Sequence, residues 1–482
     1  MKLSDIVKDI EIKEIIGSID ANISGIAFNS KEVKPGYVFV CIRGLKADGH
    51  NFVQDALDKG AVAVVAECKV PDVAANMIIV DNTRLALAKI SAAFYDYPYK
   101  KFKLIGITGT NGKTTTTYLI KSVLEHNGYK VGLIGTNQNM VGNEVIPSSH
   151  TTPDPLSLME LFDKMAKCGA EYVVMEVSSH SLDQDRVAAC EFYTGAITNV
   201  TQDHLDYHKT MENYVMAKSR LFKMCNVGLV NNDDFSEKVI KENADCKILT
   251  YGAEKDSDIK ADNIVMDSKG VAFDLCYNGE SVKMSLGIPG RFSVYNALTS
   301  IGCLISLGLS LNDIKEGLAE AKGVKGRIEV VPLEKDYTVI IDYAHTPDGL
   351  LNIIQTIRGF AKGRVITLFG CGGDRDKTKR PIMGEIAGKL SDFCVVTSDN
   401  PRTEKPSDII KDIIEGISKT DCEYTVVENR FDAIEYALDN AEKDDIILLA
   451  GKGHETYQIL GERTIVFDER EIVLKLLEDS KR

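Results

Sequence analysis

The segment from Gly109 to Thr115 reads Gly-Thr-Asn-Gly-Lys-Thr-Thr and carries the strongest chemical signal in the sequence. Glycines let backbone N–H groups close on phosphate oxygens, a lysine reaches the β and γ phosphates of a nucleotide, and a hydroxyl can ligate Mg²⁺. The strict phosphate-loop pattern also requires a glycine at position 107, where this chain has Ile107. A glycine-rich turn that only leads into a helix is therefore the competing interpretation. Because a strand-like run precedes the segment and a helical pattern follows it, we expect a nucleotide phosphate site. Its expected contacts are Gly109, Thr110, Asn111, Gly112, Lys113, Thr114 and Thr115.

Three further residues could complete this site with a divalent ion. Glu176 follows an apolar run, and His204 lies in a polar stretch that follows another apolar run. A carboxylate and an imidazole beside bound phosphates can hold one or two hard cations such as Mg²⁺. By itself, His204 could equally be a buried histidine with satisfied hydrogen bonds. Lys218 lies in a segment with helical spacing, where an ordinary surface lysine is the simplest interpretation.

Four polar or glycine-rich loops follow apolar runs in the last third of the chain. The runs are Thr338 to Asp342, Val365 to Phe369, Val395 to Ser398 and Ile446 to Ala450. The loops are Tyr343 to His345, Gly370 to Arg375, Asp399 to Arg402 and Gly451 to Glu455. Ligands of open α/β sheets bind beyond the carboxyl ends of the strands, so we expect the four loops to meet at one edge. The last loop lacks the third glycine of a dinucleotide fingerprint and has too little chain after it for a βαβ unit, so we expect no NAD site there.

The elements that must position these residues indicate an α/β protein of three domains. With 482 residues, the chain exceeds the ~250 to 300 residues at which a single core stops growing. We expect a smaller N-terminal α/β domain over residues 1–100, a central domain over 101–326 and a C-terminal domain with a Rossmann-like sheet over 327–482. In the first domain, short strands are expected at Tyr37 to Ile42, Ala61 to Ala66 and Met77 to Val80.

The central domain alternates strand-like and helical segments, which predicts a parallel, doubly wound sheet around the phosphate loop. The expected strands are Leu104 to Thr108, Val131 to Ile134, Tyr172 to Val177, Gly195 to Asn199 and Val227 to Val230. Near the end of this domain, apolar and polar residues alternate on both sides of Asn278-Gly279, a dipeptide that suits a type I′ turn. An antiparallel hairpin is expected there.

Composition and charge exclude several classes of function. Lys and Arg number 57 against 71 Asp and Glu, and the net charge of −14 repels nucleic-acid backbones and anionic membrane surfaces. The 11 cysteines lack CxxC spacing and the N-terminus has no apolar signal core. No apolar run approaches the ~20 residues of a membrane-spanning helix. We therefore expect a cytoplasmic monomer with reduced thiols and with neither nucleic-acid nor membrane partners.

Seven segments occur in the order seen in Mur ligases, and the chain resembles this family over essentially its whole length. They are Gly109 to Thr115, Glu176 to His180, Asn199 to His204, Lys218, Gly290 to Asn296, Asp342 to His345 and Asp399 to Arg402. The resemblance implies a uridine-nucleotide domain, a central ATPase domain and a C-terminal domain that binds an amino acid. It also implies that ATP phosphorylates the D-glutamate carboxylate of UDP-N-acetylmuramoyl-L-alanyl-D-glutamate, after which an amine attacks the acyl phosphate. A carboxylate is a poor electrophile until one oxygen becomes a phosphate leaving group, and crowded anions require Mg²⁺ and a lysine.

The same resemblance implies roles for single residues. Lys218 would be a carbamate formed with CO₂, which turns a cation into a carboxylate-like ligand for Mg²⁺. The implied catalytic residues are Lys113, Lys218, His204 and Glu176, and the implied metal ligands are Thr114, Glu176, His204 and Lys218. Further ATP contacts would be Asn296, Arg327 and His345, with Asp342 as an orienting carboxylate. The muramoyl dipeptide would contact Ser30, Thr151, Thr152, Ser178, Gln184 and Arg186, although Asn29 and Lys31 replace the usual Asp and Arg around Ser30.

The amino acid to be added is expected to be meso-2,6-diaminopimelate and not L-lysine. The two differ by one carboxylate on the distal carbon, and Arg402 offers a bidentate fork for it while Pro401 fixes the loop. The alternative is that Arg402 only caps a surface loop. By resemblance, the residues that hold the amino acid would be Arg375, Asp399, Asn400, Pro401, Arg402, Gly451 and Glu455.

Two competing functions remain. Folylpolyglutamate synthase uses ATP for a ligation on the same fold, but Asp399 to Glu404 and Thr151-Thr152-Pro153 argue against it. A binding or scaffold protein could instead use ATP only to close its domains. Turnover that depends on an added amine would identify a ligase.

Overall fold

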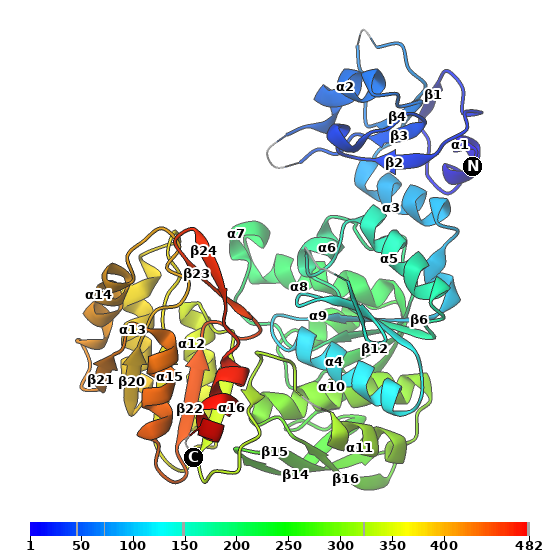
Figure 1. The fold of residues 1–482 in the computed structure, drawn as a ribbon. Helices are drawn as coiled ribbons and strands as arrows, with labels where there is room; N and C mark the ends of the chain where they lie inside the picture. Colours follow the sequence, from blue (N-terminus) through cyan, green and yellow to red (C-terminus); the bar gives the residue numbers. More distant parts are fainter. Residues whose placement is uncertain (45–46, 72, 147–149, 322, 480–482) are drawn as a thin grey trace. The chain divides into compact units, whose positions relative to one another are not determined.

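The computed structural model describes residues 1–44, 47–71, 73–146, 150–321 and 323–479 (Figure 1). The chain divides into two compact units. The first comprises Met1–Ile259 with Thr299–Ser310, and the second comprises Lys260–Leu298 with Leu311–Arg482. The domain boundaries expected at residues 100 and 326 stay a prediction.

The first unit begins with a five-stranded sheet in the order β1-β5-β4-β3-β2. Its strands are β1 (Glu14–Ile16), β2 (Gly25–Ala27), β3 (Tyr37–Val40), β4 (Ala63–Ala66) and β5 (Met77–Ile79). Its helices are α1 (Leu3–Ile6), α2 (Val53–Asp58) and α3 (Thr83–Phe94). The four strands β2 to β5 are parallel, and β1 joins β5 antiparallel. The three strands expected in this region are confirmed.

A second sheet in this unit carries the phosphate loop, with parallel strands in the order β13-β12-β11-β6-β10-β7. The strands are β6 (Lys103–Thr108), β7 (Val131–Ile134), β10 (Tyr172–Glu176), β11 (Phe192–Ile197), β12 (Cys225–Asn231) and β13 (Lys247–Gly252). The helices are α4 (Lys113–His126), α5 (Pro155–Lys167), α6 (Ser179–Asp183), α7 (Leu205–His208), α8 (Met211–Ser219) and α9 (Glu237–Asn243). The doubly wound parallel sheet is therefore confirmed. Strand β11 ends two residues before the predicted Asn199, because Thr198 and Asn199 turn toward the phosphate loop.

Short antiparallel strands extend this sheet beyond β7. They are β8 (Asn139–Val141) and β9 (Glu144–Ile146), and β8 pairs with β7. Strand β6 lies between β10 and β11, and the carboxyl ends of these three strands are side by side. Glu176 of β10 pairs with Ile107 of β6, and Ile197 of β11 pairs with Thr108 of β6. The chain segments that leave these three ends can therefore share one ligand site.

The second unit contains the predicted hairpin. Strands β15 (Gly270–Tyr277) and β16 (Glu280–Leu286) pair antiparallel, with Tyr277 opposite Glu280. The two turn residues have positive φ angles, +50° at Asn278 and +82° at Gly279, as a type I′ turn requires. Near this hairpin in sequence lie β14 (Ile259–Asp267), α10 (Arg291–Leu307) and α11 (Leu311–Glu320). The hairpin prediction is confirmed.

The C-terminal sheet of the second unit has the order β17-β18-β22-β19-β20-β21. Its strands are β17 (Glu329–Val330), β18 (Thr338–Asp342), β19 (Val365–Phe369), β20 (Phe393–Val396), β21 (Glu423–Val426) and β22 (Ile446–Ala450). The surrounding elements are α12 (Pro347–Arg358), α13 (Lys379–Leu390), α14 (Pro406–Ile417), α15 (Arg430–Asp439), α16 (Glu469–Asp479) and the hairpin β23 (Tyr457–Leu460) with β24 (Arg463–Val466) (Figure 1). Within the six-stranded sheet, all strands except β17 are parallel.

Two hydrophobic clusters cover the two faces of this sheet, one with helices α12, α13 and α14 and the other with α15 and α16. The carboxyl ends of the neighbouring strands are level, with Asp342 beside Ala450 and Phe369 beside Val396. The expectation that four polar loops meet at one edge is therefore confirmed. None of the helices among the described residues is both long and apolar enough to cross a membrane. All 11 cysteines lie in the described ranges and are free thiols.

Candidate active site

The phosphate loop is held against the end of β11. Gly109 has φ +137° and Gly112 has φ +83°, both in the region that favours glycine. A Cβ on Gly109 would collide with Thr198 Oγ1 and lie 3.2 Å from the backbone of Asn199. The carbonyl of Asn199 accepts from Thr110 N–H at 2.8 Å, and its side-chain oxygen accepts from Asn111 N–H at 3.1 Å. The loop conformation is thus fixed by residues just after strand β11, about ninety residues later in the chain.

Lys113 begins helix α4, at the end of the phosphate loop. Its Nζ donates to the carbonyls of Gly109 at 2.9 Å and Thr110 at 2.8 Å, so the ammonium group lies over its own loop. The positive N-terminal end of the 14-residue helix adds to the field of this ammonium group. Backbone N–H groups, a helix N-terminus and a lysine therefore converge where an anion such as a phosphate can bind.

Glu176 ends strand β10 and is 1% exposed. Its Oε1 accepts from Thr114 Oγ1 at 3.0 Å and from Thr136 N–H at 2.9 Å, and its Oε2 accepts from Thr136 Oγ1 at 3.0 Å. The carboxylate is therefore oriented toward the first turn of α4, beside the phosphate loop.

Lys218 lies on helix α8 and is 1% exposed, so the interpretation as an ordinary surface lysine is wrong. Its Nζ donates to Gly109 O at 2.8 Å and lies 4.4 Å from the centre of the Tyr214 ring. Burial, and then the charge of Lys113, hold the pKa of Lys218 well below its usual value. A buried amine of this kind spends more time unprotonated, and the unprotonated amine is the form that can react with CO₂.

His204 is half-exposed, so the interpretation as a buried histidine is wrong. Its ring packs edge-on against His180, with centroids 4.8 Å apart, and lies 6.2 Å from Tyr214. Its Nε2 lies 3.5 Å from a carboxylate oxygen of Asp203. His204 and Lys218 thus both flank Tyr214, whereas Thr114 and Glu176 contact each other directly.

Of the four predicted metal ligands, Thr114 and Glu176 contact each other directly. Across the described part of the chain, no group of three His, Cys, Asp or Glu side chains is placed to hold a metal ion. The hydroxyl of Thr114 and the carboxylate of Glu176 nevertheless offer two oxygen ligands at 3.0 Å from each other. Mg²⁺ commonly takes one or two protein oxygens and completes its shell with water and phosphate oxygens. This pair fits such an ion.

Five of the residues predicted to hold the dipeptide lie beside Glu176. Thr152 Oγ1 donates to the backbone carbonyl of Glu176 at 2.9 Å and accepts from Ser178 N–H at 3.0 Å. Arg186 donates to the carbonyl of Thr152 at 3.0 Å and to the side chain of Gln184 at 2.8 Å. The hydroxyls of Thr151 and Thr136 lie 3.0 Å apart. The sixth, Ser30, begins a short 3₁₀ helix in the N-terminal sheet region, where its carbonyl accepts from Lys59 at 3.1 Å.

The residues predicted to hold the amino acid gather at the carboxyl edge of the C-terminal sheet. Asn400 donates to Glu455 at 2.9 Å, and Lys452 donates to the same carboxylate oxygen at 3.0 Å. Gly451 has φ +113°, and a Cβ there would lie 2.8 Å from the carboxylate of Asp399. Four of the predicted residues, Asp399, Asn400, Gly451 and Glu455, are therefore brought together.

Arg402 and Arg375 lie in two facing loops of the same edge. Arg402 has a left-handed φ of +51°, and its Nη1 donates to Gly373 O at 2.8 Å. A Cβ on Gly372 would lie 3.0 Å from Arg402 Nη1 and 3.8 Å from Arg375 Cγ, so both side chains pass Gly372. Pro401, between Asn400 and Arg402, presents its carbonyl to Gly373. Arg402 supports a loop and also keeps further guanidinium N–H groups for a ligand.

Of the predicted ATP contacts in the second unit, Arg327 and His345 lie around Tyr343, and Asn296 lies on helix α10. The Arg327 guanidinium lies 5.2 Å from the centre of the Tyr343 ring, and the His345 ring lies 4.5 Å from it. Asp342 accepts from the N–H groups of Ile328 and Ala344, each at 2.9 Å, while burial raises its pKa. Asn296 is buried on helix α10.

Several residues that shape these sites escaped the sequence interpretation. Thr136 binds both oxygens of Glu176, Tyr214 lies close to both His204 and Lys218, and Lys452 binds Glu455. Thr136 follows strand β7 closely, so the same rule that singled out polar residues after strands could have found it. The same rule applies to Lys452, which follows strand β22 within the predicted loop Gly451 to Glu455. Tyr214 carried no comparable signal, because an aromatic residue on a helix is ordinary.

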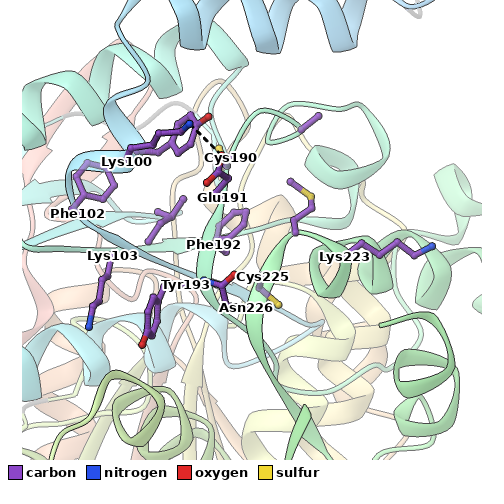
Figure 2. Close-up of a pocket in the computed structure, with 14 residues that line it drawn as sticks. Lys100, Phe102, Lys103, Cys190, Glu191, Phe192, Tyr193, Lys223, Cys225 and Asn226 are labelled. Atoms are coloured by element: carbon purple, nitrogen blue, oxygen red, sulfur yellow. Dashed lines mark ion pairs between the residues drawn. The ribbon is translucent and has the colours of Figure 1, made fainter. Parts of the chain in front are cut away.

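A cavity of about 590 Å³ lies at the opposite edge of the sheet, at the amino ends of β6, β11 and β12 (Figure 2). Lys100 at its rim pairs with Glu191 at 3.6 Å, and Lys103 lies 4.6 Å from the centre of the Tyr193 ring. The phosphate loop leaves the carboxyl end of β6, so this cavity is no part of the candidate site.

Three family models match the chain in succession. The Mur ligase family catalytic domain matches residues 22–95, the Mur ligase middle domain matches 107–304, and the glutamate ligase domain of Mur ligases matches 326–453. The UDP-N-acetylmuramoyl-L-alanyl-D-glutamate--2,6-diaminopimelate ligase of Caldanaerobacter subterraneus subsp. tengcongensis is 49% identical, with 100% of both chains covered.

Solved structures show the same fold. A structure of UDP-N-acetylmuramoyl-L-alanyl-D-glutamate--2,6-diaminopimelate ligase is 29% identical and superposes with a TM-score of 0.78, covering 100% of this chain and 99% of that one. The MurF ligase of Thermotoga maritima in complex with ADP is 20% identical, with a TM-score of 0.60 and coverage of 95% and 97%. The predicted fold class of three α/β domains is confirmed by these likenesses.

Proposed function

The chain belongs to the Mur ligase family, and we propose that it uses ATP to join meso-2,6-diaminopimelate to UDP-N-acetylmuramoyl-L-alanyl-D-glutamate in peptidoglycan precursor synthesis. The observation that carries the proposal is the position of Glu176. Its carboxylate binds Thr114 of the phosphate loop, while its backbone carbonyl binds Thr152 of the predicted dipeptide site. The γ-phosphate of ATP and the acceptor carboxylate of the dipeptide can thus bind on either side of Glu176 and come close to each other. The full-length likeness to a diaminopimelate ligase favours this substrate over folylpolyglutamate.

The phosphate loop would bind and activate ATP. The N–H groups at the start of α4 and the Lys113 ammonium group would take the β and γ phosphates, displacing the carbonyls that Lys113 now contacts. The γ-phosphoryl group would pass to the D-glutamate carboxylate to form an acyl phosphate, with ADP as leaving group. The amine of the incoming amino acid would attack the acyl carbon, phosphate would leave, and an amide bond would form. Electrostatic stabilisation of crowded anions is the main contribution of the protein.

Mg²⁺, when bound, would neutralise the phosphate oxygens that approach the acceptor carboxylate. Thr114 and Glu176 would hold it, and Lys218 as a carbamate would contribute two further oxygens. The low pKa and nearly complete burial of Lys218 support this modification, because they favour the neutral amine. His204, whose ring lies 6.2 Å from that of Tyr214, would contact the acceptor side of the same ion.

Two groups of residues would select the substrates: the predicted dipeptide contacts and the predicted amino-acid contacts. Arg186, fixed by Thr152 and Gln184, would hold the dipeptide together with Thr151 and Ser178. Ser30 would contact the uridine nucleotide. Gly451 and Glu455 would receive the distal ammonium end of diaminopimelate, and Arg402 would bind its distal carboxylate. Arg375, Asp399 and Asn400 would help to hold the amino acid.

We propose Asn296, Arg327 and His345 as further ATP contacts, with Asp342 as an orienting carboxylate. We also propose that the protein acts as a cytoplasmic monomer without nucleic-acid or membrane partners. The 11 free cysteines support the cytoplasmic location, and the net charge of −14 supports the absence of nucleic-acid and membrane partners.

Phosphate release separates the ligase from a protein that uses ATP only to close its domains. The wild-type protein is incubated with MgATP and the UDP-linked dipeptide, with and without diaminopimelate. We expect sustained release of phosphate only when the amino acid is present. Release at the same rate without any amine would contradict ligation and favour the scaffold.

A further inference from the structure

Glu404 joins the two loops that carry the arginines of the proposed amino-acid site. Its Oε1 accepts from Asp374 N–H at 2.6 Å and from Arg380 Nη2 at 2.8 Å, and its Oε2 accepts from Arg380 Nη1 at 3.1 Å. Lys377 adds an ion pair at 3.0 Å. Asp374 belongs to the loop after β19 and Glu404 to the loop after β20, so one carboxylate binds both loops to a single guanidinium.

Arg380 cannot move easily, because it is 0% exposed between helices α13 and α14. Its Nη1 also donates to Asp412 of α14 at 2.8 Å. The two helices are in backbone contact there, since a Cβ on Gly384 or Gly416 would collide with a main-chain carbonyl of the other helix. The hydrogen bonds from Arg380 lower the pKa of Glu404 to about 2, so Glu404 is ionised throughout the physiological range. The carboxylate is thus fixed by a rigid pair of helices.

The positions of Arg402 and Asp374 depend on this link. Both residues have left-handed backbone conformations, with φ +51° and φ +55°, which residues other than glycine adopt at an energetic cost that is smaller for Asp than for Arg. Such conformations persist only where surrounding contacts impose them. Thr403 Oγ1 donates to Asp374 at 2.7 Å, and Arg402 Nη1 donates to Gly373 O at 2.8 Å. The main chain of Arg402 is fixed by the segment around β23, because its N–H donates to Ile459 O at 3.3 Å and its carbonyl accepts from Gly461 N–H at 2.9 Å. Glu404 holds the Gly373–Asp374 peptide, whose N–H donates to Glu404 and whose carbonyl accepts from the Arg402 guanidinium group.

We propose that Glu404, through its contacts with Arg380 and Asp374, is a positioning residue that sets the preference for diaminopimelate over lysine by placing Arg402. This inference rests on the proposed function, in which Arg402 faces the distal carboxylate of the amino acid. Glu404 itself contacts no substrate. Its effect would appear only for a substrate that carries the distal carboxylate.

The test compares kcat/KM for diaminopimelate and for lysine in the same preparation, so that the fraction of folded enzyme cancels in the ratio. Glu404→Gln keeps the shape of the side chain but removes its charge. Glu385→Gln is the matched control, because Glu385 forms a surface ion pair with Lys389 on the same helix as Arg380. We expect Glu404→Gln to reduce the preference by about tenfold or more, mainly by raising KM for diaminopimelate, and KM for ATP to stay unchanged. Glu385→Gln should leave the preference unchanged.

A second arm asks whether Glu404 acts through Arg402. Glu404→Gln is combined with Arg402→Ala, and the combined loss should be less than about twofold beyond that of Arg402→Ala alone. If the losses of preference caused by Glu404→Gln and Arg402→Ala multiply in the double variant, the two residues act independently and the inference is overturned. A Glu404→Gln enzyme with the wild-type preference would overturn it as well. If Glu404→Gln does not fold, Thr403→Val provides the test, because it removes the side-chain hydrogen bond to Asp374 and keeps only the one from the backbone N–H, and it must lower the preference. A wild-type enzyme that accepts lysine equally well would instead refute the proposed function.

Discussion

The exchange Gly109→Ala would disturb the phosphate loop at its closest approach to strand β11. The new Cβ would collide with Thr198 Oγ1 and lie 3.2 Å from the main chain of Asn199. Those two residues hold the loop, because Thr198 Oγ1 donates to Asn111 O at 2.6 Å and Asn199 O accepts from Thr110 N–H at 2.8 Å. To relieve the collision, the loop must move away from the contacts that orient its N–H groups.

The magnitude follows from two costs. Alanine at φ +137° costs about 1 to 2 kcal/mol relative to glycine, and the displaced hydrogen bond of Thr198 costs about 1 kcal/mol more. If the nucleotide requires the original loop conformation, both costs reduce the free energy of binding. At 1.4 kcal/mol per factor of ten, we expect the dissociation constant of MgADP to rise by about 30- to 150-fold.

Isothermal titration calorimetry with MgADP measures this change, and Gly128→Ala is the matched control. Gly128 follows the same helix with φ +85°, but a Cβ there would meet nothing within 4 Å. It should therefore cost about 1 kcal/mol of stability through backbone strain and leave the affinity unchanged. A Gly109→Ala protein that binds MgADP as tightly as the wild type would refute the assignment of this loop to the phosphates.

Three further substitutions test the remaining roles. Lys113→Ala should keep its circular dichroism spectrum but lose turnover, because the β and γ phosphates lose their cation; near-normal phosphate release would reject its role. Lys218→Ala should be inactive and partly restored by short carboxylic acids that replace the carbamate. A mass spectrum of active wild-type enzyme, recorded without acid, that shows only unmodified Lys218 would count against the carbamate. Arg402→Ala should raise KM for diaminopimelate by about tenfold or more, as expected for the loss of a bidentate ion pair, with KM for ATP unchanged as the internal control.

The sequence predicts those features that depend on neighbours in the chain. The phosphate loop, the buried strands around it and the Asn278-Gly279 hairpin follow from periodicity and turn chemistry within a few residues. The loops after β18, β19, β20 and β22 could also be located, because polar residues directly follow apolar runs. Their meeting at one edge is then a consequence of parallel pairing.

The features that could not be predicted depend on contacts between distant residues. The burial of Lys218 arises from its contact with Gly109, more than one hundred residues earlier, and nothing in its own helix signals it. Glu404 and Arg380 each look like surface residues in sequence, yet the glycine contacts between α13 and α14 enclose Arg380. Pattern analysis near a residue cannot find such contacts, because tertiary packing creates them.

The mass of the reaction product tests the central claim most directly. Wild-type protein is incubated with MgATP, UDP-N-acetylmuramoyl-L-alanyl-D-glutamate and a panel of amino acids that includes meso-diaminopimelate and L-lysine, supplied separately and in competition. We predict a nucleotide product heavier by one diaminopimelate residue, formed in preference to the lysine product and accompanied by ADP and phosphate. A product that contains lysine in equal or greater amount would contradict the assigned amino acid, and the absence of any amide product would contradict the ligase.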